Sequence, residues 1–231
     1  MMPHVTELIY FHPKPSVKPE DSSNDEGLAL LQVFRSTTQQ SGHIGSAWGR
    51  TREDENVIVW AIDWSDAHSG IQQTNSPLTP FLQENTQITT LFTTLQPTDE
   101  SDSPATQTLI SNPITEIAPL PFPTSLSPQD RSSLSADLVA FRRAFVKEAE
   151  EKLRTKSFLL GQVERPGEFK HEKAESGQAF VQLLAVGWES YDQHQEARKA
   201  DVFTEKIKPI RERMVAPLGQ LGMVHVKFQK V

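Results

Sequence analysis

Cysteine is absent from this 231-residue chain. Its absence excludes disulfide bridges, thiolate metal sites, iron–sulfur clusters and cysteine nucleophiles. The chain also lacks an apolar run close to the roughly 20 residues that a membrane-spanning helix needs. Its first residues, MMPHVTELIYFHPKP, lack the basic region and long apolar core of a signal peptide. These absences predict a cytoplasmic protein that does not work in a membrane.

Positive charge is scarce as well. The chain has 23 Lys and Arg against 30 Asp and Glu, which gives a net charge of -7 at pH 7. Nucleic acids and anionic membranes call for a basic face, so we expect a small-molecule substrate as the partner and no nucleic acid. The hydrophobic fraction of 36 % is low, but 12 Phe and 4 Trp are enough to build a core.

Motifs for metals and cofactors are missing too. Gly42, Gly45 and Gly49 depart from the G-x-G-x-x-G spacing, and a strand follows them where that motif needs a helix. The seven histidines are scattered, with no His-x-His or HExxH pattern. We therefore predict no metal and no cofactor, and a haem ligand among these histidines stays an unsupported alternative.

Two similar stretches organise the chain. Phe180–Val202 runs as an apolar strand into Trp188, turns at Glu189-Ser190 and starts a helix that carries His194. Val57–Gly70 repeats this order with Trp64, a short acidic and serine turn, and His68. The duplication predicts two halves, residues 1–96 and 105–231, joined by a polar linker at 97–104.

Each half is predicted to read β-α-β-β-α-β from its hydrophobic periodicity and turn residues. For the first half the expected elements are strand Val5–Phe11, helix Asp25–Ser41 with a Ser23–Glu26 capping box, strands His43–Arg52 and Asn56–Trp64, a short helix with His68, and strand Gln87–Leu95.

The second half is predicted to follow the same order. Its strongest helix starts at an N-cap serine, Ser127, and buries the stripe Leu134, Leu138, Phe141, Phe145, Ala149 and Leu153. Its other expected elements are strand Thr106–Ile117, a covering loop at Pro119–Pro128, strands Ser157–Arg165 and Ala179–Trp188, a helical region from Ser190 interrupted at Pro209, and closing strand Leu221–Lys230.

This pattern resembles the dimeric α/β-barrel superfamily, and within it the tandem antibiotic-biosynthesis-monooxygenase-like proteins of fungal type. The residues that carry the resemblance are Gly187-Trp188-Glu189-Ser190 with His194, and more weakly Trp64-Ser65-Asp66 with His68. The resemblance implies an α+β fold in which two tandem ferredoxin-like halves form an intramolecular dimeric α/β barrel, as a monomer or homodimer. Members include cofactor-free oxygenases, cyclases, haem enzymes and stress-responsive proteins, so the fold alone selects no reaction.

His194 is the first candidate for a catalytic group. In the first turn of a helix capped by Ser190, the positive helix end disfavours imidazolium and keeps the ring able to accept a proton. His68 is the second candidate. Trp188, Trp64, Tyr191, Trp48 and Arg50 are candidates for binding a planar or anionic substrate. For each of these residues, packing in the core or a solvated ion pair is the alternative.

The predicted function is that of a cofactor-independent enzyme acting on a small aromatic or polyketide-like metabolite. A histidine base would start oxygenation, cyclisation or decarboxylation, and the substrate would supply the reactive carbanion. The alternative is a non-catalytic protein that binds small molecules or responds to stress.

Overall fold

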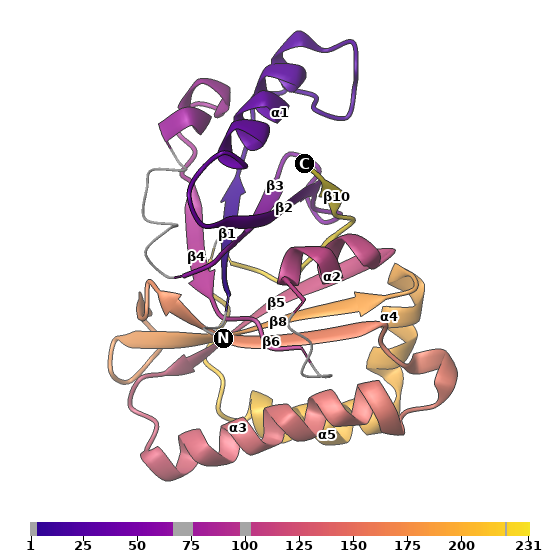
Figure 1. Ribbon diagram of the computed structural model, residues 1–231. Coiled ribbons are helices and arrows are strands. Elements are labelled where there is room, and N and C mark those ends of the chain that lie inside the picture. The colour runs from indigo at the N-terminus through magenta and orange to yellow at the C-terminus, as the bar shows by residue number, and fades with distance from the viewer. Residues whose placement is uncertain (1–3, 67–75, 98–102, 220) are drawn as a thin grey trace.

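The computed structural model describes residues 4–66, 76–97, 103–219 and 221–231. Within them the chain forms an α+β fold built on a curled antiparallel sheet of ten strands with five α-helices (Figure 1). The strand order is β10-β2-β3-β1-β4-β6-β8-β5-β9, and β7 pairs with β8. No helix in the described part of the chain combines the length and apolar character needed to cross a bilayer.

The first half contributes four neighbouring strands: β1 (Val5–Phe11), β2 (His43–Arg50), β3 (Ile58–Trp64) and β4 (Thr89–Thr93). Helix α1 (Asp25–Thr37) and a 3₁₀ helix, Ser76–Phe81, cover their outer face. All four strands were predicted. The short helix expected around His68 falls outside the described residues.

The second half contributes β5 (Ile114–Pro123), β6 (Ser157–Arg165), β7 (Phe169–Lys170), β8 (Gln178–Trp188) and β9 (Val224–Val226). Below them in Figure 1 lie α3 (Pro128–Arg143) and α5 (Asp201–Arg211), and α4 (Tyr191–Lys199) lies at the right-hand end of the strands. A π-helical turn, Ala144–Glu148, extends α3. Ser127 caps α3 as predicted, accepting from the Asp130 N–H, and the predicted apolar stripe is buried.

The sheet curls until its ends meet. At one seam β4 pairs with β6, with Thr93 opposite Val163. At the other seam β9 pairs with β5 on one side, and its Val226 forms a bridge to Thr51 just beyond β2 on the other. The last strand, β10 (Gln229–Lys230), then pairs with β2. Residues 224–230 therefore join the two halves of the sheet.

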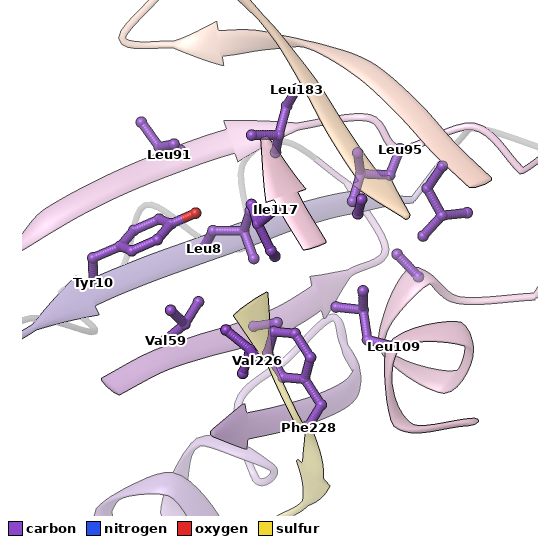
Figure 2. Packing of buried hydrophobic residues seen from close by; sticks show 14 of the residues in the cluster. Leu8, Tyr10, Val59, Leu91, Leu95, Leu109, Ile117, Leu183, Val226 and Phe228 are labelled. Carbon is purple, nitrogen blue, oxygen red and sulfur yellow. The ribbon is translucent and has the colours of Figure 1, made fainter. Parts of the chain in front are cut away.

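Apolar side chains fill the space inside the curled sheet. Leu8, Val59, Leu91, Ile117 and Leu183 converge there from five different strands (Figure 2). Alternate residues of each strand point the other way, so Ile9 packs beneath α1 instead. The described side chains inside the barrel thus form a packed apolar core.

The proline-rich segment is part of a strand, which corrects the predicted covering loop at Pro119–Pro128. Pro119, Pro121 and Pro123 lie in β5 and pair with β8. Their spacing of two directs all three nitrogens toward the same edge of β5, and β9 covers that edge only at Thr115–Ile117. No ladder hydrogen bond is lost, because proline is tolerated where a strand edge is open.

A helix replaces part of another predicted strand. Residues Ala105–Ser111 form α2, where the sequence pattern predicted a strand over Thr106–Ile117. Asp63, fully buried on β3, accepts hydrogen bonds from the Thr106 N–H and hydroxyl, both at 2.7 Å, and from the Thr6 hydroxyl at 2.7 Å. This contact with the first half fixes the start of α2, and no local pattern could reveal it.

Asp63→Asn is expected to lower the free energy of unfolding by about 1–3 kcal/mol. Both carboxylate oxygens of Asp63 accept hydrogen bonds, so the amide nitrogen of asparagine must face a donor. Urea denaturation measures the loss, with the exposed Glu55→Gln on the β2–β3 turn as control. Equal stability of Asp63→Asn and wild type would contradict this account of α2.

Three other boundaries differ from the prediction. Asn24 caps α1 by accepting from the Gly27 N–H, so the expected Ser23–Glu26 capping box is wrong; Ser23 bonds Asp21 instead. The C-terminal helical region divides at Ala200, whose backbone is extended, and not at a proline. The predicted closing strand divides into β9 and β10, because it serves a different neighbour at each end.

Candidate functional site

A cavity of about 170 Å³ lies between the outer face of the second-half strands and the helices that cover them. Strands β5, β6 and β8 form its floor, and α3, its π-helical turn, α4 and α5 form its walls. Five aromatic side chains dominate the lining: Phe141, Phe145, Phe158, Trp188 and Phe203. A planar apolar molecule suits such a lining.

Four polar side chains interrupt the apolar lining of this cavity: Glu116, His194, Arg198 and Arg211. Ser190 caps α4 by accepting from the Gln193 N–H at 3.1 Å, and this places His194 in the first turn of the helix as predicted. Arg198 lies one turn further along α4. The cavity therefore has a titratable pair on one side and guanidinium groups beside it.

Glu116 and His194 form the centre of the site. His194 Nε2 lies 3.3 Å from Glu116 Oε2, which also accepts a 3.1 Å hydrogen bond from Trp188 Nε1. The Trp188 ring stacks on the imidazole at 4.8 Å between ring centroids. The indole therefore orients both titratable groups, and Glu116 Oε1 has no protein partner in the described part of the chain.

Two further residues extend this pair away from the cavity. His194 Nδ1 lies 2.7 Å from His225 Nε2, and His225 Nδ1 lies 2.6 Å from Glu53 Oε1. Glu53 Oε2 also accepts from the backbone N–H of His225 at 2.7 Å. Because Glu53 comes from the β2–β3 turn, both halves of the chain build the site.

Burial sets the protonation of the central pair. It raises the pKa of Glu116 to about 7, although the Trp188 hydrogen bond and the charge of Arg198 act in the opposite direction. Burial also lowers the pKa of His194 to about 3, helped by His225 and Arg198. The 3.3 Å contact between His194 and Glu116 therefore involves a neutral ring and is not an ion pair.

The structure brings two of the seven predicted site residues, His194 and Trp188, to this cavity. Tyr191 lies nearby, in a T-shaped contact with His225 at 4.9 Å between ring centroids, and the Arg52 guanidinium lies over the Tyr191 ring. Three other predicted residues lie elsewhere: Trp64 and Trp48 are buried in the first half, and Arg50 bonds Glu20 and the Val17 carbonyl. His68 falls outside the described residues.

Sequence reasoning missed Glu116, His225 and Glu53. A signal for Glu116 was present, because Thr115-Glu116 repeats Thr6-Glu7 at the same place on the first strand of each half. The repetition is structural too: Glu7 accepts from Trp64 Nε1 at 2.9 Å as Glu116 does from Trp188. His225 and Glu53 carried no such signal.

Among the described residues, the corresponding face of the first half is packed. Leu30 and Phe34 of α1 fill it together with Trp48, Trp60 and Leu78. The Phe34 and Trp60 rings lie 4.4 Å apart between centroids. The two halves therefore share the carboxylate–indole pair, but the cavity described above belongs to the second half.

The glycine of the Gly187-Trp188-Glu189-Ser190 sequence has a packing role. A Cβ atom at Gly187 would overlap the Asn112 side chain. Asn112 in turn bonds the hydroxyls of Thr115 and Ser157, both at 3.0 Å. The glycine thus lets the start of β5 and the end of β8 approach closely beside Trp188.

The cavity does not fit a haem iron held by histidine. Such a histidine needs a free ring nitrogen, and both nitrogens of His194 already face protein partners. No group of three or more His, Cys, Asp or Glu in the described ranges is arranged to hold a metal ion.

Several solved structures superpose on nearly the whole of this chain. An anthrone oxidase-like protein superposes with a TM-score of 0.61 at 12 % identity, covering 99 % of this chain and 94 % of its own. A chlorite dismutase mutant from Candidatus Nitrospira defluvii superposes with a TM-score of 0.53 at 12 % identity, covering 98 % of this chain and 92 % of its own. A candidate monooxygenase from Fusobacterium nucleatum superposes with a TM-score of 0.53 at 9 % identity, covering 99 % of this chain and 92 % of its own.

These likenesses, all at low identity, show the fold alone. Within its described residues the chain has the α+β fold of these neighbours, with a curled antiparallel sheet and five α-helices. The resemblance in the sequence to dimeric α/β-barrel proteins implied an α+β fold of this kind. No protein-family model matches the sequence. No curated protein matches it either.

Proposed function

We propose that this protein is a cofactor-independent enzyme that removes a proton from a small aromatic or polyketide-like metabolite. The observation that carries the proposal is the His194–Glu116 pair, 3.3 Å apart, in the wall of an aromatic cavity. A carboxyl group whose pKa is about 7 exchanges protons readily near neutral pH, which suits a general acid–base. Oxidase-like and monooxygenase-like proteins among the structural neighbours are consistent with this chemistry.

In the proposed reaction the metabolite stacks among the phenyl rings and presents an acidic C–H or phenolic O–H to Glu116. The carboxylate takes the proton, and the electron pair stays on the substrate as a delocalised anion. Arg198 and Arg211, which line the cavity, stabilise that anion. It then reacts with dioxygen, closes a ring or loses carbon dioxide.

We further propose that residues 1–96 and 105–231 are tandem ferredoxin-like halves joined by a linker at 97–104. The strand orders support this division: β2-β3-β1-β4 in the first half matches β6-β8-β5-β9 in the second. The first half would then be the structural partner, supplying Glu53, and the second half would hold the substrate.

Anthrone and dioxygen are the first substrates to test. Loss of the anthrone C–H proton to Glu116 leaves a carbanion, and its reaction with one O₂ gives anthraquinone and one water. An oxygen electrode and chromatography of the quinone would measure a rate above the uncatalysed one. No turnover of anthrone or of a panel of polyphenols would contradict the proposed activity.

The competing function is binding without catalysis. The engagement of both His194 nitrogens by protein groups favours it, because such a ring can serve structure alone. A ligand that shifts the protein's melting temperature and is recovered unchanged would identify a binding protein. Turnover that requires Glu116 would identify the enzyme.

Ala118→Leu is expected to weaken binding of the aromatic ligand at least about tenfold, because a larger side chain on β5 fills the cavity. Isothermal titration calorimetry measures the dissociation constant. Ala136→Leu makes the same change on the exposed face of α3 and should leave binding unaltered. Equal affinity for both variants would mean that the ligand binds elsewhere.

A further inference from the structure

Four side chains form a continuous chain of polar contacts from the cavity to the rim of the barrel. It runs from Glu116 on β5 through His194 on α4 and His225 on β9 to Glu53 on the β2–β3 turn, with steps of 3.3, 2.7 and 2.6 Å. We propose that this chain is a proton relay that moves the proton of Glu116 out of the cavity to Glu53. The relay gives His225 and Glu53 a role in proton transfer, and it rests on the proposed function for its part in turnover.

Glu53 fixes the direction of the hydrogen bonds. Its Oε2 accepts the backbone N–H of His225, and its Oε1 faces Nδ1 of the same residue. As a carboxylate it can only accept, so His225 carries its proton on Nδ1 and presents the Nε2 lone pair to His194. His194 then carries its own proton on Nδ1 and presents Nε2 to Glu116, which donates as a carboxylic acid.

A second arrangement holds the same three protons. Each proton moves one step outward along the relay, so Glu116 becomes a carboxylate, both rings become Nε2–H tautomers, and Glu53 becomes a carboxylic acid. The total charge is unchanged and neither ring is ever an imidazolium. Glu116 can now accept a proton from the substrate. When it passes that proton to the product, the three protons return and the first arrangement is restored.

Burial favours the first arrangement at rest, because it keeps the negative charge on the more accessible group. The Glu116 side chain is 12 % exposed, whereas that of Glu53 is 36 % exposed. Glu53 also lines a second cavity of about 100 Å³ at the barrel rim, with Tyr10, Thr51, Asp54 and Thr89 among its polar neighbours. Water in such a polar cavity could solvate the charge.

Within the described residues, three other charged or titratable side chains surround the relay: Arg198, Tyr191 and Arg52. Arg198 acts on both Glu116 and His194 from α4, and the Tyr191 ring packs edge-on against His225. Arg52 lies over Tyr191 at 4.3 Å from the ring centroid. Among these groups Glu53 is the one that bonds a relay ring from the solvent side, which makes it the point at which to break the relay.

Glu53→Gln reverses the tautomers. A backbone N–H can only donate, so the amide oxygen of the new glutamine turns to the His225 N–H and its NH₂ faces Nδ1. His225 must then accept at Nδ1 and carry its proton on Nε2, and His194 must follow. Nitrogen-15 NMR of histidine-labelled protein reads both tautomers without any substrate. We expect Nδ1–H in both rings of the wild type and a switch of more than half of each population to Nε2–H in the variant.

Glu55→Gln, on the same turn and exposed, is the matched control and should leave the spectra unchanged. Nε2–H tautomers or charged rings in the wild type would overturn the relay, whether or not the protein is an enzyme. So would an unchanged His194 tautomer in Glu53→Gln. His171 is not part of the relay and bonds the Ala216 carbonyl, so its nitrogen-15 NMR signal should not change in Glu53→Gln.

Turnover supplies the second measurement. With the rings fixed as Nε2–H, Glu116 accepts from His194 and is a weaker base. Glu53→Gln should therefore lower kcat about tenfold or more, move the acidic limb of the pH–rate profile to lower pH, and leave KM unchanged. A merely structural role for Glu53 would not shift that limb, so an unshifted profile also counts against the relay. If the wild type shows no turnover but the tautomers still switch in Glu53→Gln, the proposed function is wrong and the hydrogen-bonding arrangement of the relay is supported.

Discussion

Glu116→Gln is expected to lower turnover of the aromatic substrate by about 10²–10⁴-fold, the range for loss of a general acid–base. Glutamine matches the size of the carboxyl group, and its amide oxygen can still accept the hydrogen bond from Trp188 Nε1. It cannot take the substrate's proton. The loss should appear in kcat, with KM little altered, and initial rates of oxygen consumption or product formation measure it.

Glu7→Gln is the matched control for this variant. Glu7 occupies the same place in the first half, buried and bonded to Trp64, but it faces a packed core and not the cavity. A stable Glu7→Gln protein should retain its rate. If Glu116→Gln stayed within about threefold of wild type, the carboxyl group would not be the base and the proposed mechanism would fail.

The same substitution should change how stability depends on pH. Burial raises the pKa of Glu116 from 4.5 to about 7, so the folded protein holds a proton there that the unfolded chain has released. The stability gained from this proton is present below pH 4.5 and is lost as the pH rises through 7. Relative to Glu116→Gln, the wild type should therefore lose about 3 kcal/mol of unfolding free energy between pH 4.5 and 7.5.

The pKa shift of His194 changes the unfolding free energy in the opposite direction with pH, and His194 is present in both the wild type and Glu116→Gln. Its pKa falls from 6.5 to about 3, so its contribution is lost as the pH falls below 6.5. Taking the difference between wild type and Glu116→Gln leaves the Glu116 contribution. Urea denaturation at several pH values measures it, with Glu55→Gln as the baseline. A constant difference across this range would show that Glu116 is not held protonated by the fold.

Much of the fold could be read from local patterns. The strands Val5–Phe11, Ser157–Arg165 and the strand ending at Trp188 were predicted because alternating or continuous apolar residues end at clear turn signals. The Ser127 cap and the apolar stripe of α3 follow from the chemistry of a helix start and a period of 3.6. Such signals lie within one element and need no partner to be visible.

Elements that depend on a distant neighbour were predicted less well. The prolines of β5 read locally as a loop, because the open strand edge that tolerates them is visible only in the sheet. Helix α2 was read as a strand, because its start is held by Asp63 from the other half. In each case a tertiary contact outweighed the local preference.

The candidate site divides in the same way. The sequence by itself placed His194 in the first turn of a capped helix beside Trp188, since both follow from the strand–turn–helix pattern of one continuous stretch. Only the tertiary structure joined Glu116, His225 and Glu53 to them, because hydrogen bonds between residues 31 to 172 positions apart leave no local periodicity. For the residues that the structure describes, it also decided that the side chains inside the barrel and on the first-half face pack together while the second-half face keeps a cavity, since packing depends on how side chains from separate elements fill a shared space.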